Sequence, residues 1–289
     1  MAEPVNLTDQ AADLAAIGAA LARARAALQL HTDSPQLDAE LLLAYTLQCS
    51  RSYIGAHPER VLDGATRERF QMLVGRRAQG EPLAYLTGER EFWSLALNVT
   101  PDVLIPRPET ELAVERCLAL RSEASAVVVD LGTGSGAIAL ALAVERPSWH
   151  LLATDRSDAA LNVARGNAAR LRISTVEFLL GDWFKPLNAR RFEIIVSNPP
   201  YVAAADPALS ALRFEPVTAL TPGNTGMEAL CTIALGAREH LVPGGWLVLE
   251  HGTTQASDLA RALVAAGFTR VRCYADLAGH DRVTEAQWT

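Results

Sequence analysis

Five apolar runs of strand length, separated by segments of helix length, constrain the fold of this chain more than any other feature. They read AVVVDLG, HLLATD, VEFLL, FEIIVSN and GWLVLEHG and lie between residues 126 and 252. Apolar strands that alternate with helices predict a parallel sheet covered on both faces. Two further runs, TRVRCYA and DRVTEAQW, have no crossover helix between them, which predicts an antiparallel hairpin at one edge. The predicted fold class is therefore α/β, with a Rossmann-like and mostly parallel sheet.

The segment before this alternation has a different composition. Residues 8 to about 80 are rich in Ala, Leu and Arg at helical spacing, and Thr8 and Ser34 stand at expected N-cap positions. Between residues 88 and 108, alternating apolar residues and chain breakers predict a short β-hairpin closed by two prolines. The predicted organisation is a small all-helical domain over residues 1–88, a β-hairpin linker over 89–108 and an α/β domain over 109–289.

Composition argues against several other classes of protein. No apolar run approaches the roughly 20 residues of a membrane-spanning helix, and the acidic, polar start MAEPVNLTDQ excludes a secretory signal. The four cysteines form no CxxC pair or Cys/His cluster, so they predict neither disulfides nor a metal site and favour a reducing cytoplasm. A net charge of −7 argues against a broad surface that grips a phosphate backbone. We therefore expect a cytoplasmic protein without a metal, a membrane span or direct nucleic-acid binding.

The run VVVDLGTGSGAIALAL carries a strand directly into a glycine-rich turn and then into a helix. Its glycines at 132, 134 and 136 let the backbone approach a ligand closely at the carboxyl end of the sheet. The G-x-G-x-G spacing and the strand-terminal Asp130 favour adenosylmethionine over a dinucleotide, whose fingerprint is G-x-G-x-x-G. The alternative is a tight turn without a ligand, but three alternating glycines cost stability unless something binds against them.

Two further strand ends carry candidate cofactor-binding residues. Asp155 ends the run LLATD, where a carboxylate can accept hydrogen bonds from both hydroxyls of a ribose. A capping role is the alternative for Asp155, and it is compatible with ribose binding. Asp182 and Trp183 follow the run VEFLL, and they place a carboxylate and a flat ring where an adenine would lie. Trp183 taken alone is more typical of a core than of a cofactor wall.

The stretch SNPPY follows the fourth strand and is expected at the same sheet edge as the glycines. Its two prolines end the strand and leave carbonyl oxygens without a neighbouring strand to pair with. A carboxamide nitrogen is a poor nucleophile because its lone pair is delocalised. If the Asn198 side-chain oxygen and the Pro199 main-chain oxygen accept its two N–H bonds, while Tyr201 packs against the flat group, the lone pair is held toward a methyl donor. No strong base is required, since the proton becomes acidic once the nitrogen is methylated.

Six blocks beyond the glycine turn occur in the order GEPLAYLTGEREFW, VLIPRPETE, SNPPY, RFEPVTAL, EHGTTQ and GHDRVT. With them, nearly the whole chain resembles the family of bacterial protein-(glutamine-N5) methyltransferases that modify class 1 peptide chain release factors. The resemblance implies S-adenosyl-L-methionine as cofactor, bound by Gly132, Thr133, Gly134, Ser135, Gly136, Asp155, Trp183 and Asn198. It also implies that the substrate glutamine is held by the catalytic residues Asn198, Pro199, Pro200 and Tyr201.

The same resemblance implies a partner and a reaction. A five-helix amino-terminal domain is expected to recognise a class 1 release factor, and the glutamine of its Gly-Gly-Gln motif is methylated on the side-chain nitrogen. Adenine-N6 DNA methyltransferases share an Asn/Asp-Pro-Pro-Tyr/Phe site, but they need a basic target-recognition region, and this chain is acidic. A dinucleotide-dependent dehydrogenase would explain the glycines and leave NPPY without a function. A non-enzymatic adenosylmethionine-binding module would not need the carbonyl acceptors.

Overall fold

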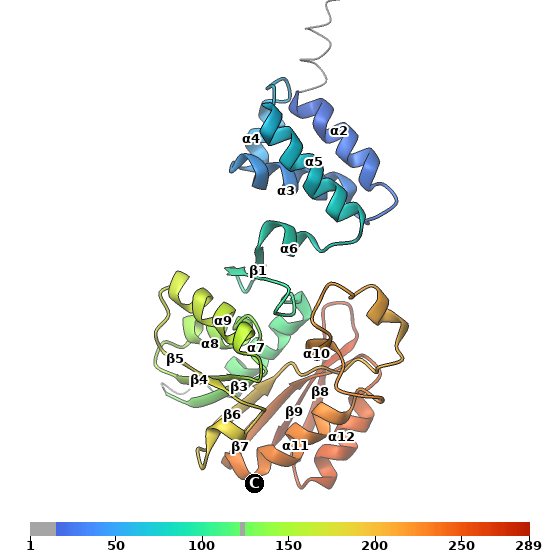
Figure 1. The fold of residues 1–289 in the computed structure, drawn as a ribbon. Helices are drawn as coiled ribbons and strands as arrows, with labels where there is room; N and C mark the ends of the chain where they lie inside the picture. Colours follow the sequence, from blue (N-terminus) through green and yellow to red (C-terminus); the bar gives the residue numbers. More distant parts are fainter. Residues whose placement is uncertain (1–15, 122–124) are drawn as a thin grey trace, which may run out of the picture. The chain divides into compact units, whose positions relative to one another are not determined.

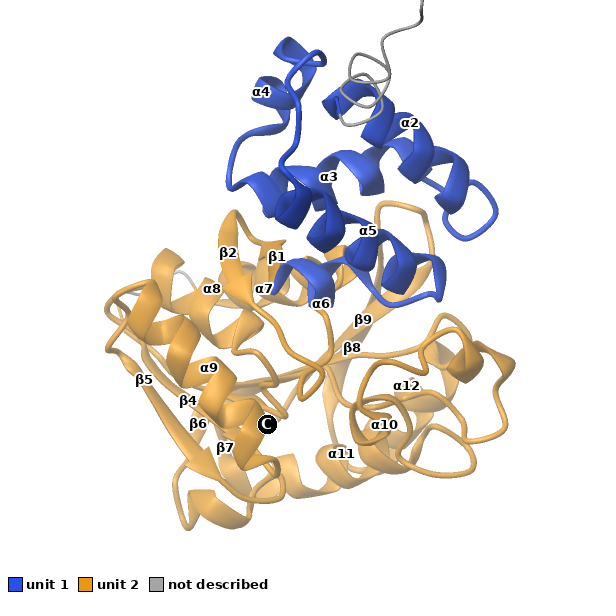
Figure 2. Ribbon diagram, turned by 45° about the horizontal axis from the view of Figure 1, so that its top comes forward, with its two compact units in different colours: residues 1–88 blue, residues 89–289 orange. Residues whose placement is uncertain are grey.

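The structure is a computed structural model that describes residues 16–121 and 125–289. The chain divides into two compact units, residues 1–88 and residues 89–289 (Figure 2). The expected N-cap at Thr8 lies outside the described residues. Among the residues that are described, no helix is both long and apolar enough to cross a membrane.

The first unit is helical, as the sequence predicts. Over residues 16–88 its helices are α2 (Ile17–Leu28), α3 (Pro35–Leu47), α4 (Arg51–Ala56), α5 (Gly64–Ala78) and α6 (Leu83–Thr87) (Figure 1). Helix α2 buries Ile17, Ala20, Ala24 and Leu28, which follow the spacing of one helix face. These side chains pack with Leu42 and Leu43 of α3 and with Phe70 of α5 in a core that belongs to this unit.

Ser34 occupies the N-cap position of α3, but it does not make the expected capping bond. Its hydroxyl donates to Asp38 Oδ1 at 3.2 Å instead of accepting from a backbone N–H. Asp38 is buried and also accepts from Nε of Arg77 on α5 at 2.7 Å. A buried carboxylate needs such donors, so Ser34 helps to satisfy the ion pair that joins α3 to α5.

The second unit begins with the predicted β-hairpin, β1 (Glu89–Phe92) and β2 (Leu95–Asn98). Its two-residue turn places Trp93 and Ser94 at φ 52° and 58°, the left-handed geometry that matches the twist of paired strands. Asn167 anchors β2: it accepts from the Asn98 N–H at 2.7 Å and donates to the Asn98 carbonyl at 3.0 Å and the Ser135 carbonyl at 2.9 Å. The hairpin is thereby tied to the glycine turn, and its role as a linker stays a prediction.

A seven-stranded sheet forms the centre of this unit, in the order β5-β4-β3-β6-β7-β9-β8. Its strands are β3 (Val127–Leu131), β4 (His150–Asp155), β5 (Val176–Leu180), β6 (Phe192–Ser197), β7 (Leu241–Glu250), β8 (Thr269–Ala275) and β9 (Asp281–Gln287). Strands β3 to β7 pair in parallel, whereas β9 pairs antiparallel with β7 and β8. The predicted parallel sheet with an antiparallel edge hairpin is confirmed.

Helices cover both faces of the sheet (Figure 1). One face packs against α7 (Glu111–Leu120), α8 (Ala137–Glu145) and α9 (Asp158–Arg170), and the other against α11 (Glu228–His240) and α12 (Ala256–Ala265). Along β3, Val128 joins the first of these cores and Val129 the second, because successive strand residues point to opposite faces. The remaining short elements are η1 (Pro108–Thr110), η2 (Lys185–Leu187), η3 (Pro207–Ser210) and α10 (Val217–Leu220).

Candidate active site

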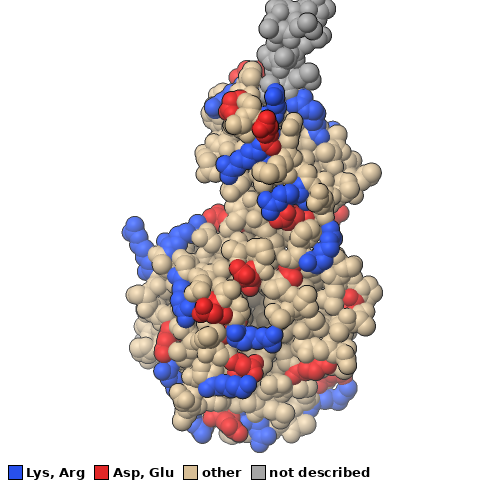
Figure 3. All heavy atoms as spheres, in the orientation of Figure 1, with Lys and Arg blue, Asp and Glu red and all other residues tan. Residues whose placement is uncertain are grey.

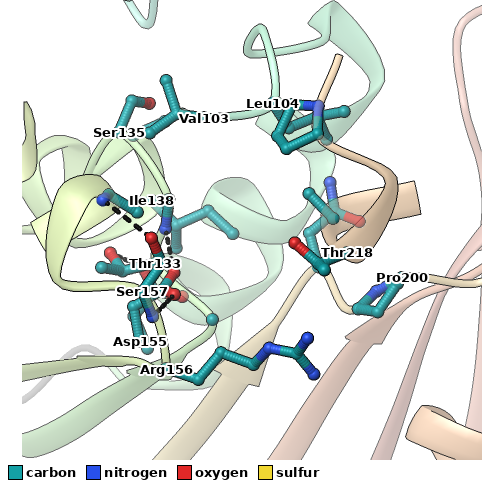
Figure 4. Close-up of a pocket in the computed structure, with 18 of the residues that line it drawn as sticks. Val103, Leu104, Thr133, Ser135, Ile138, Asp155, Arg156, Ser157, Pro200 and Thr218 are labelled. Carbon is teal, nitrogen blue, oxygen red and sulfur yellow. Dashed lines mark hydrogen bonds between the residues drawn. The ribbon is translucent and has the colours of Figure 1, made fainter. Parts of the chain in front are cut away.

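A pocket lies at the carboxyl ends of β3, β4, β5 and β6, and it measures about 1000 Å³ with its open mouth included. The predicted residues that line it are Gly132, Thr133, Gly134, Ser135, Asp155, Trp183, Asn198 and Pro200. Three predicted residues, Gly136, Pro199 and Tyr201, are not part of this lining. Figure 4 shows Thr133, Asp155 and Ser157 facing Pro200 and Thr218 across the space. We call the wall formed by Gly132 to Ser135, Asp155 and Trp183 the glycine side of the pocket, and the wall formed by Asn198 and Pro200 the asparagine side.

The three glycines of the turn have φ of 72°, 56° and 85°, all in the left-handed region, but they meet different surroundings. A Cβ on Gly132 would lie 3.3 Å from Cζ3 of Trp183, so the indole ring lies directly against the turn. A Cβ on Gly136 would lie 3.0 Å from Cδ1 of Leu140 and 3.2 Å from Cβ of Ala164, so this glycine serves helix packing. No atom lies within 4 Å of the corresponding position on Gly134. Gly134 therefore faces the open pocket.

Asp155 fixes the turn from the neighbouring strand end. Its Oδ2 accepts the Gly134 N–H at 2.9 Å and its Oδ1 accepts the Ser157 N–H at 2.9 Å (Figure 4). Asp155 does not cap α9 itself, because the N-cap is Ser157, whose hydroxyl accepts the Ala160 N–H at 3.2 Å. Each carboxylate oxygen has two lone pairs and keeps one for a further donor. The half-buried side chain can thus hold the turn and bind ribose hydroxyls, and the second role stays a prediction.

Asp130 belongs to the glycine side, although the sequence analysis used it only to favour one cofactor. The residue is 1% exposed, its Oδ2 accepts from Oγ1 of Thr133 at 2.6 Å, and its Oδ1 has no hydrogen bond of ordinary geometry among the described residues. Burial raises the pKa of this carboxyl to about 7, while the bond from Thr133 and the nearby backbone N–H of Ala139 oppose the rise. An unpaired buried carboxylate oxygen that lines a pocket suits a cationic group such as the ammonium of adenosylmethionine.

On the asparagine side, Asn198 is held by a residue 88 positions earlier in the chain. Its Nδ2 donates to Oγ1 of Thr110 at 3.1 Å, and Thr110 is 4% exposed. A carboxamide whose nitrogen is engaged in this way keeps its oxygen free to accept. Since Asn198 lines the pocket, this arrangement leaves Oδ1 as the acceptor for a bound substrate. Thr110, in η1, was missed because no local pattern pairs it with the fourth strand.

Tyr201 lies behind this wall rather than in it. Its hydroxyl donates to Oε1 of Glu250 at 3.2 Å, and its carbonyl accepts from Nε2 of Gln255 at 3.0 Å. Burial and the neighbouring Glu250 raise the pKa of Tyr201. Burial also raises the pKa of Glu250, to about 7. Packing of the Tyr201 ring against a substrate stays a prediction, and the contact with Glu250 was not foreseen.

Glu215 joins two of the sequence blocks at the rim of the pocket. This buried carboxylate accepts from the Ile105 N–H at 3.1 Å and from Nη2 of Arg107. The pairing connects VLIPRPETE with RFEPVTAL, and both blocks contribute to the pocket lining. The lining residues from these blocks are Val103, Leu104, Pro106, Arg107, Thr110, Pro216, Thr218 and Ala219. The sequence marked the blocks by resemblance alone and gave no reason for their residues.

Sheet order and the glycine turn after the first parallel strand define a class I methyltransferase. Two solved structures share this fold. A methyltransferase from Pyrococcus furiosus has a TM-score of 0.52 and 21% identity, and the match covers 67% of this chain and 88% of that one. The hMettl16 catalytic domain has a TM-score of 0.57 and 16% identity, and the match covers 75% of this chain and 81% of that one. Family models described as "PrmC N-terminal domain" and "Methyltransferase small domain" match residues 19–88 and 111–214.

Curated relatives extend the match over nearly the full length. The chain is 48% identical to the release factor glutamine methyltransferase of Pseudomonas aeruginosa, over 89% of this chain and 94% of that protein. It is 44% identical to the enzyme of that name from Shewanella oneidensis, over 96% and 98%. It is 50% identical to the one from Burkholderia pseudomallei, over 86% and 90%. The chain belongs to the release factor glutamine methyltransferase family, as the sequence blocks predict.

Proposed function

We propose that this enzyme transfers a methyl group from S-adenosyl-L-methionine to the side-chain nitrogen of the glutamine in the Gly-Gly-Gln motif of class 1 peptide chain release factors. The observation that carries the proposal is the bond from the Asn198 nitrogen to Thr110, which leaves the oxygen of this pocket-lining side chain as an acceptor for a substrate. The names of the curated relatives support the same reaction. We place the reaction in the cytoplasm.

The glycine side has the features needed to hold the donor. Gly134 offers open backbone, Asp130 an unpaired carboxylate oxygen, Asp155 free lone pairs, and Trp183 a ring against the turn. The donor supplies an electrophilic methyl group on a sulfonium. In our proposal the turn and Asp130 hold the methionine part, Asp155 the ribose and Trp183 the adenine.

The asparagine side orients the acceptor nitrogen. Asn198 Oδ1 and the Pro199 carbonyl accept the two N–H bonds of the glutamine amide, so the nitrogen lone pair points toward the methyl group. Accepting both bonds also stabilises the positive charge that develops on the nitrogen. The new N–C bond forms as the S–C bond breaks, and the nitrogen then releases one proton to water. Pro199 and Pro200 keep this carbonyl out of the sheet ladder.

A direct assay tests the proposal. The full-length enzyme is incubated with methyl-labelled adenosylmethionine and a purified release factor, and the labelled product is mapped by peptide mass spectrometry. We expect one labelled peptide, which contains the Gly-Gly-Gln glutamine. Label on adenine when duplex DNA replaces the release factor would support the DNA methyltransferase alternative. That alternative needs a basic surface, whereas the face in Figure 3 carries cationic and anionic side chains interspersed over the second unit.

We also propose that residues 1–88 recognise the release factor, with 89–108 as a linker to a catalytic domain over 109–289. A glutamine side chain offers few contacts, so selection of one glutamine requires surface beyond the pocket. The division into compact units at Gly88 and the core inside the first unit support an independent binding module.

Truncation tests this division of labour. A chain that begins at Gly88, and that still folds and binds adenosylmethionine, should lose most of its kcat/KM on the folded release factor. It should lose much less on a short Gly-Gly-Gln peptide, because such a peptide does not reach residues 1–88. Initial rates on both substrates give the comparison. Equal losses on the two substrates would instead assign residues 1–88 to folding alone.

A further inference from the structure

Glu250, at the end of β7, is a buried carboxylate that the proposed reaction does not use. The residue is 1% exposed and begins the block EHGTTQ. Its Oε1 accepts from the Tyr201 hydroxyl at 3.2 Å, whereas its Oε2 has no hydrogen bond of ordinary geometry among the described residues. Burial of a carboxylate in this way costs stability. Glu250 ends β7, which pairs with β6, and it therefore lies at the same sheet edge as Asn198.

Thr110 contacts Asn198, and Asn198 follows Ser197, the β6 residue that pairs with Leu249 just before Glu250. The Thr110 hydroxyl oxygen accepts from Nδ2 of Asn198 at 3.1 Å, so the hydroxyl proton remains to be donated elsewhere. Thr110 also affects Glu250. Burial raises the pKa of the Glu250 carboxyl, and the Thr110 hydroxyl and the charge of Arg282 are the main groups that lower this pKa. The side chains of Asn198, Thr110 and Glu250 are thus a candidate series: its first link is the Asn198–Thr110 bond, and its second would be a bond from the Thr110 hydroxyl to the unpaired Oε2 of Glu250.

The direction of hydrogen bonding along this series follows from the chemistry of its ends. A carboxylate can only accept, a hydroxyl both donates and accepts, and a carboxamide does either through different atoms. If Thr110 donates to Glu250, its oxygen can only accept from Asn198, and Asn198 must then present Oδ1 to the pocket. If Thr110 donated to Asn198 instead, the carboxamide would turn over and present its NH2 group, which repels the N–H bonds of a substrate amide.

We propose that Glu250 is a positioning residue that acts through Thr110 and fixes the Asn198 carboxamide with its oxygen toward the substrate nitrogen. The inference rests on the proposed function and adds to it a residue that touches neither substrate nor cofactor. The loop itself is held separately, since the Tyr201 carbonyl accepts from Gln255 Nε2 at 3.0 Å and Gln255 Oε1 accepts from the Gly252 N–H at 2.8 Å. Loss of the Glu250 charge should therefore affect the orientation of Asn198 more than the path of the backbone.

The substitution Glu250→Gln tests the inference, because glutamine keeps the shape and an acceptor for Tyr201 but adds a donor that can bond to Thr110. We expect kcat on a saturating release factor to fall about 30-fold or more, on the scale of losing one polar group aligned with the transition state. The dissociation constant for adenosylmethionine, measured by calorimetry, should stay within about twofold, because the glycine side is untouched. Thr110→Val should reproduce the loss, and Thr110→Ser, which keeps the hydroxyl, should restore most of the rate.

A double variant and a matched control separate positioning from general destabilisation. Glu250→Gln combined with Thr110→Val should be no slower than either single variant, because both break the same series. Glu285→Gln is the control: Glu285 is also buried and accepts from a tyrosine hydroxyl, Tyr274 at 2.8 Å, but it pairs with Arg116 and does not line the pocket. This control should lower the melting temperature and leave kcat near that of the wild type.

Several outcomes would overturn the inference: wild-type kcat in Glu250→Gln, additive losses in the double variant, or a loss of kcat in Glu285→Gln equal to that in Glu250→Gln. If Glu250→Gln does not fold, equal rates for Thr110→Val and Thr110→Ser overturn it instead. A wild-type enzyme that binds adenosylmethionine but labels no release factor would contradict the proposed function, and that result is distinguishable because it precedes any comparison of variants.

Discussion

The two sides of the pocket are built by different means. The glycine side comes from consecutive strand ends between Asp130 and Trp183, and its key contacts run through backbone N–H groups and left-handed glycines. On the asparagine side, residues that are 88 and 49 positions apart are joined by side chains, Asn198 to Thr110 and Tyr201 to Glu250. The comparison indicates that cofactor binding depends on local geometry, whereas orientation of the substrate depends on the assembled fold. Four experiments test this separation.

The largest effect is expected on the asparagine side. Asn198→Ala removes the acceptor that faces the pocket and should cut methyl transfer by about 100-fold or more, the cost of losing one well-placed polar group in a transition state. Affinity for adenosylmethionine should change far less than turnover. Rates with labelled donor and release factor measure turnover, and calorimetry measures the affinity for adenosylmethionine. Asn162→Ala, an exposed asparagine on α9 that bonds to Asp158, serves as control. Near wild-type turnover in Asn198→Ala would remove its role.

The counterpart on the glycine side is Asp155→Ala. This change removes a carboxylate that binds two backbone N–H groups, together with the lone pairs proposed for the ribose. Adenosylmethionine binding should weaken by about 2–3 kcal/mol, from the loss of charge-assisted hydrogen bonds. Calorimetry measures the affinity, with the exposed Asp158→Ala as control. An unchanged dissociation constant would place the ribose elsewhere.

Two glycine variants separate ligand binding from packing within the turn. Gly134→Ala and Gly136→Ala both strain a left-handed residue, at about 1–2 kcal/mol each. Only the second forces a methyl group against Leu140 and Ala164, which should lower the free energy of unfolding by about 1–2 kcal/mol more. Gly134→Ala should weaken the binding of adenosylmethionine more than Gly136→Ala does, since the new methyl group at position 134 projects into the open pocket. Chemical denaturation and calorimetry on both variants make the comparison, and the reverse ranking would contradict it.

The smallest expected effect is a pH dependence of donor binding. The pKa of Asp130 is raised to about 7, so its carboxyl is ionised above this pH and protonated below it. A cationic donor binds the ionised form, and its affinity should therefore fall as the pH is lowered from 8 to 6, by up to about tenfold. Calorimetric titrations across this range measure the slope. Asp130→Asn should remove the slope, and Glu250→Gln, on the asparagine side, should keep it.

The sequence predicted well what repeats locally. The seven strands, the edge hairpin and the β1–β2 hairpin follow from apolar patterning and chain breakers, and these signals are read over a few residues. The strand ends that carry Gly132, Asp155 and Asn198 meet because parallel strands share one carboxyl edge. The family followed from blocks in order, which the curated relatives confirm.

What the sequence could not predict are contacts between distant segments. Thr110 and Glu250 lie in blocks that the sequence marked by resemblance alone, and only the fold places both beside NPPY. The capping bond expected of Ser34 fails for the same reason, since the nearby Asp38 must satisfy Arg77 on another helix. Tertiary contacts override local preference at such positions.

Glu215 has a consequence for the order in which the enzyme becomes functional as it is made. It accepts from Ile105, 110 positions earlier, so the rim of the pocket cannot close until the chain has been synthesised past residue 215. The glycine turn and Asp155 leave the ribosome well before that point, while β7, β8 and β9, which complete the sheet, follow it. Long-range closures of this kind form late, because the loop entropy is lost before the contact forms. A nascent chain therefore carries an open half-site, and a translation arrest between Asp155 and Glu215 yields a polypeptide that has the cofactor turn and lacks the rim over it.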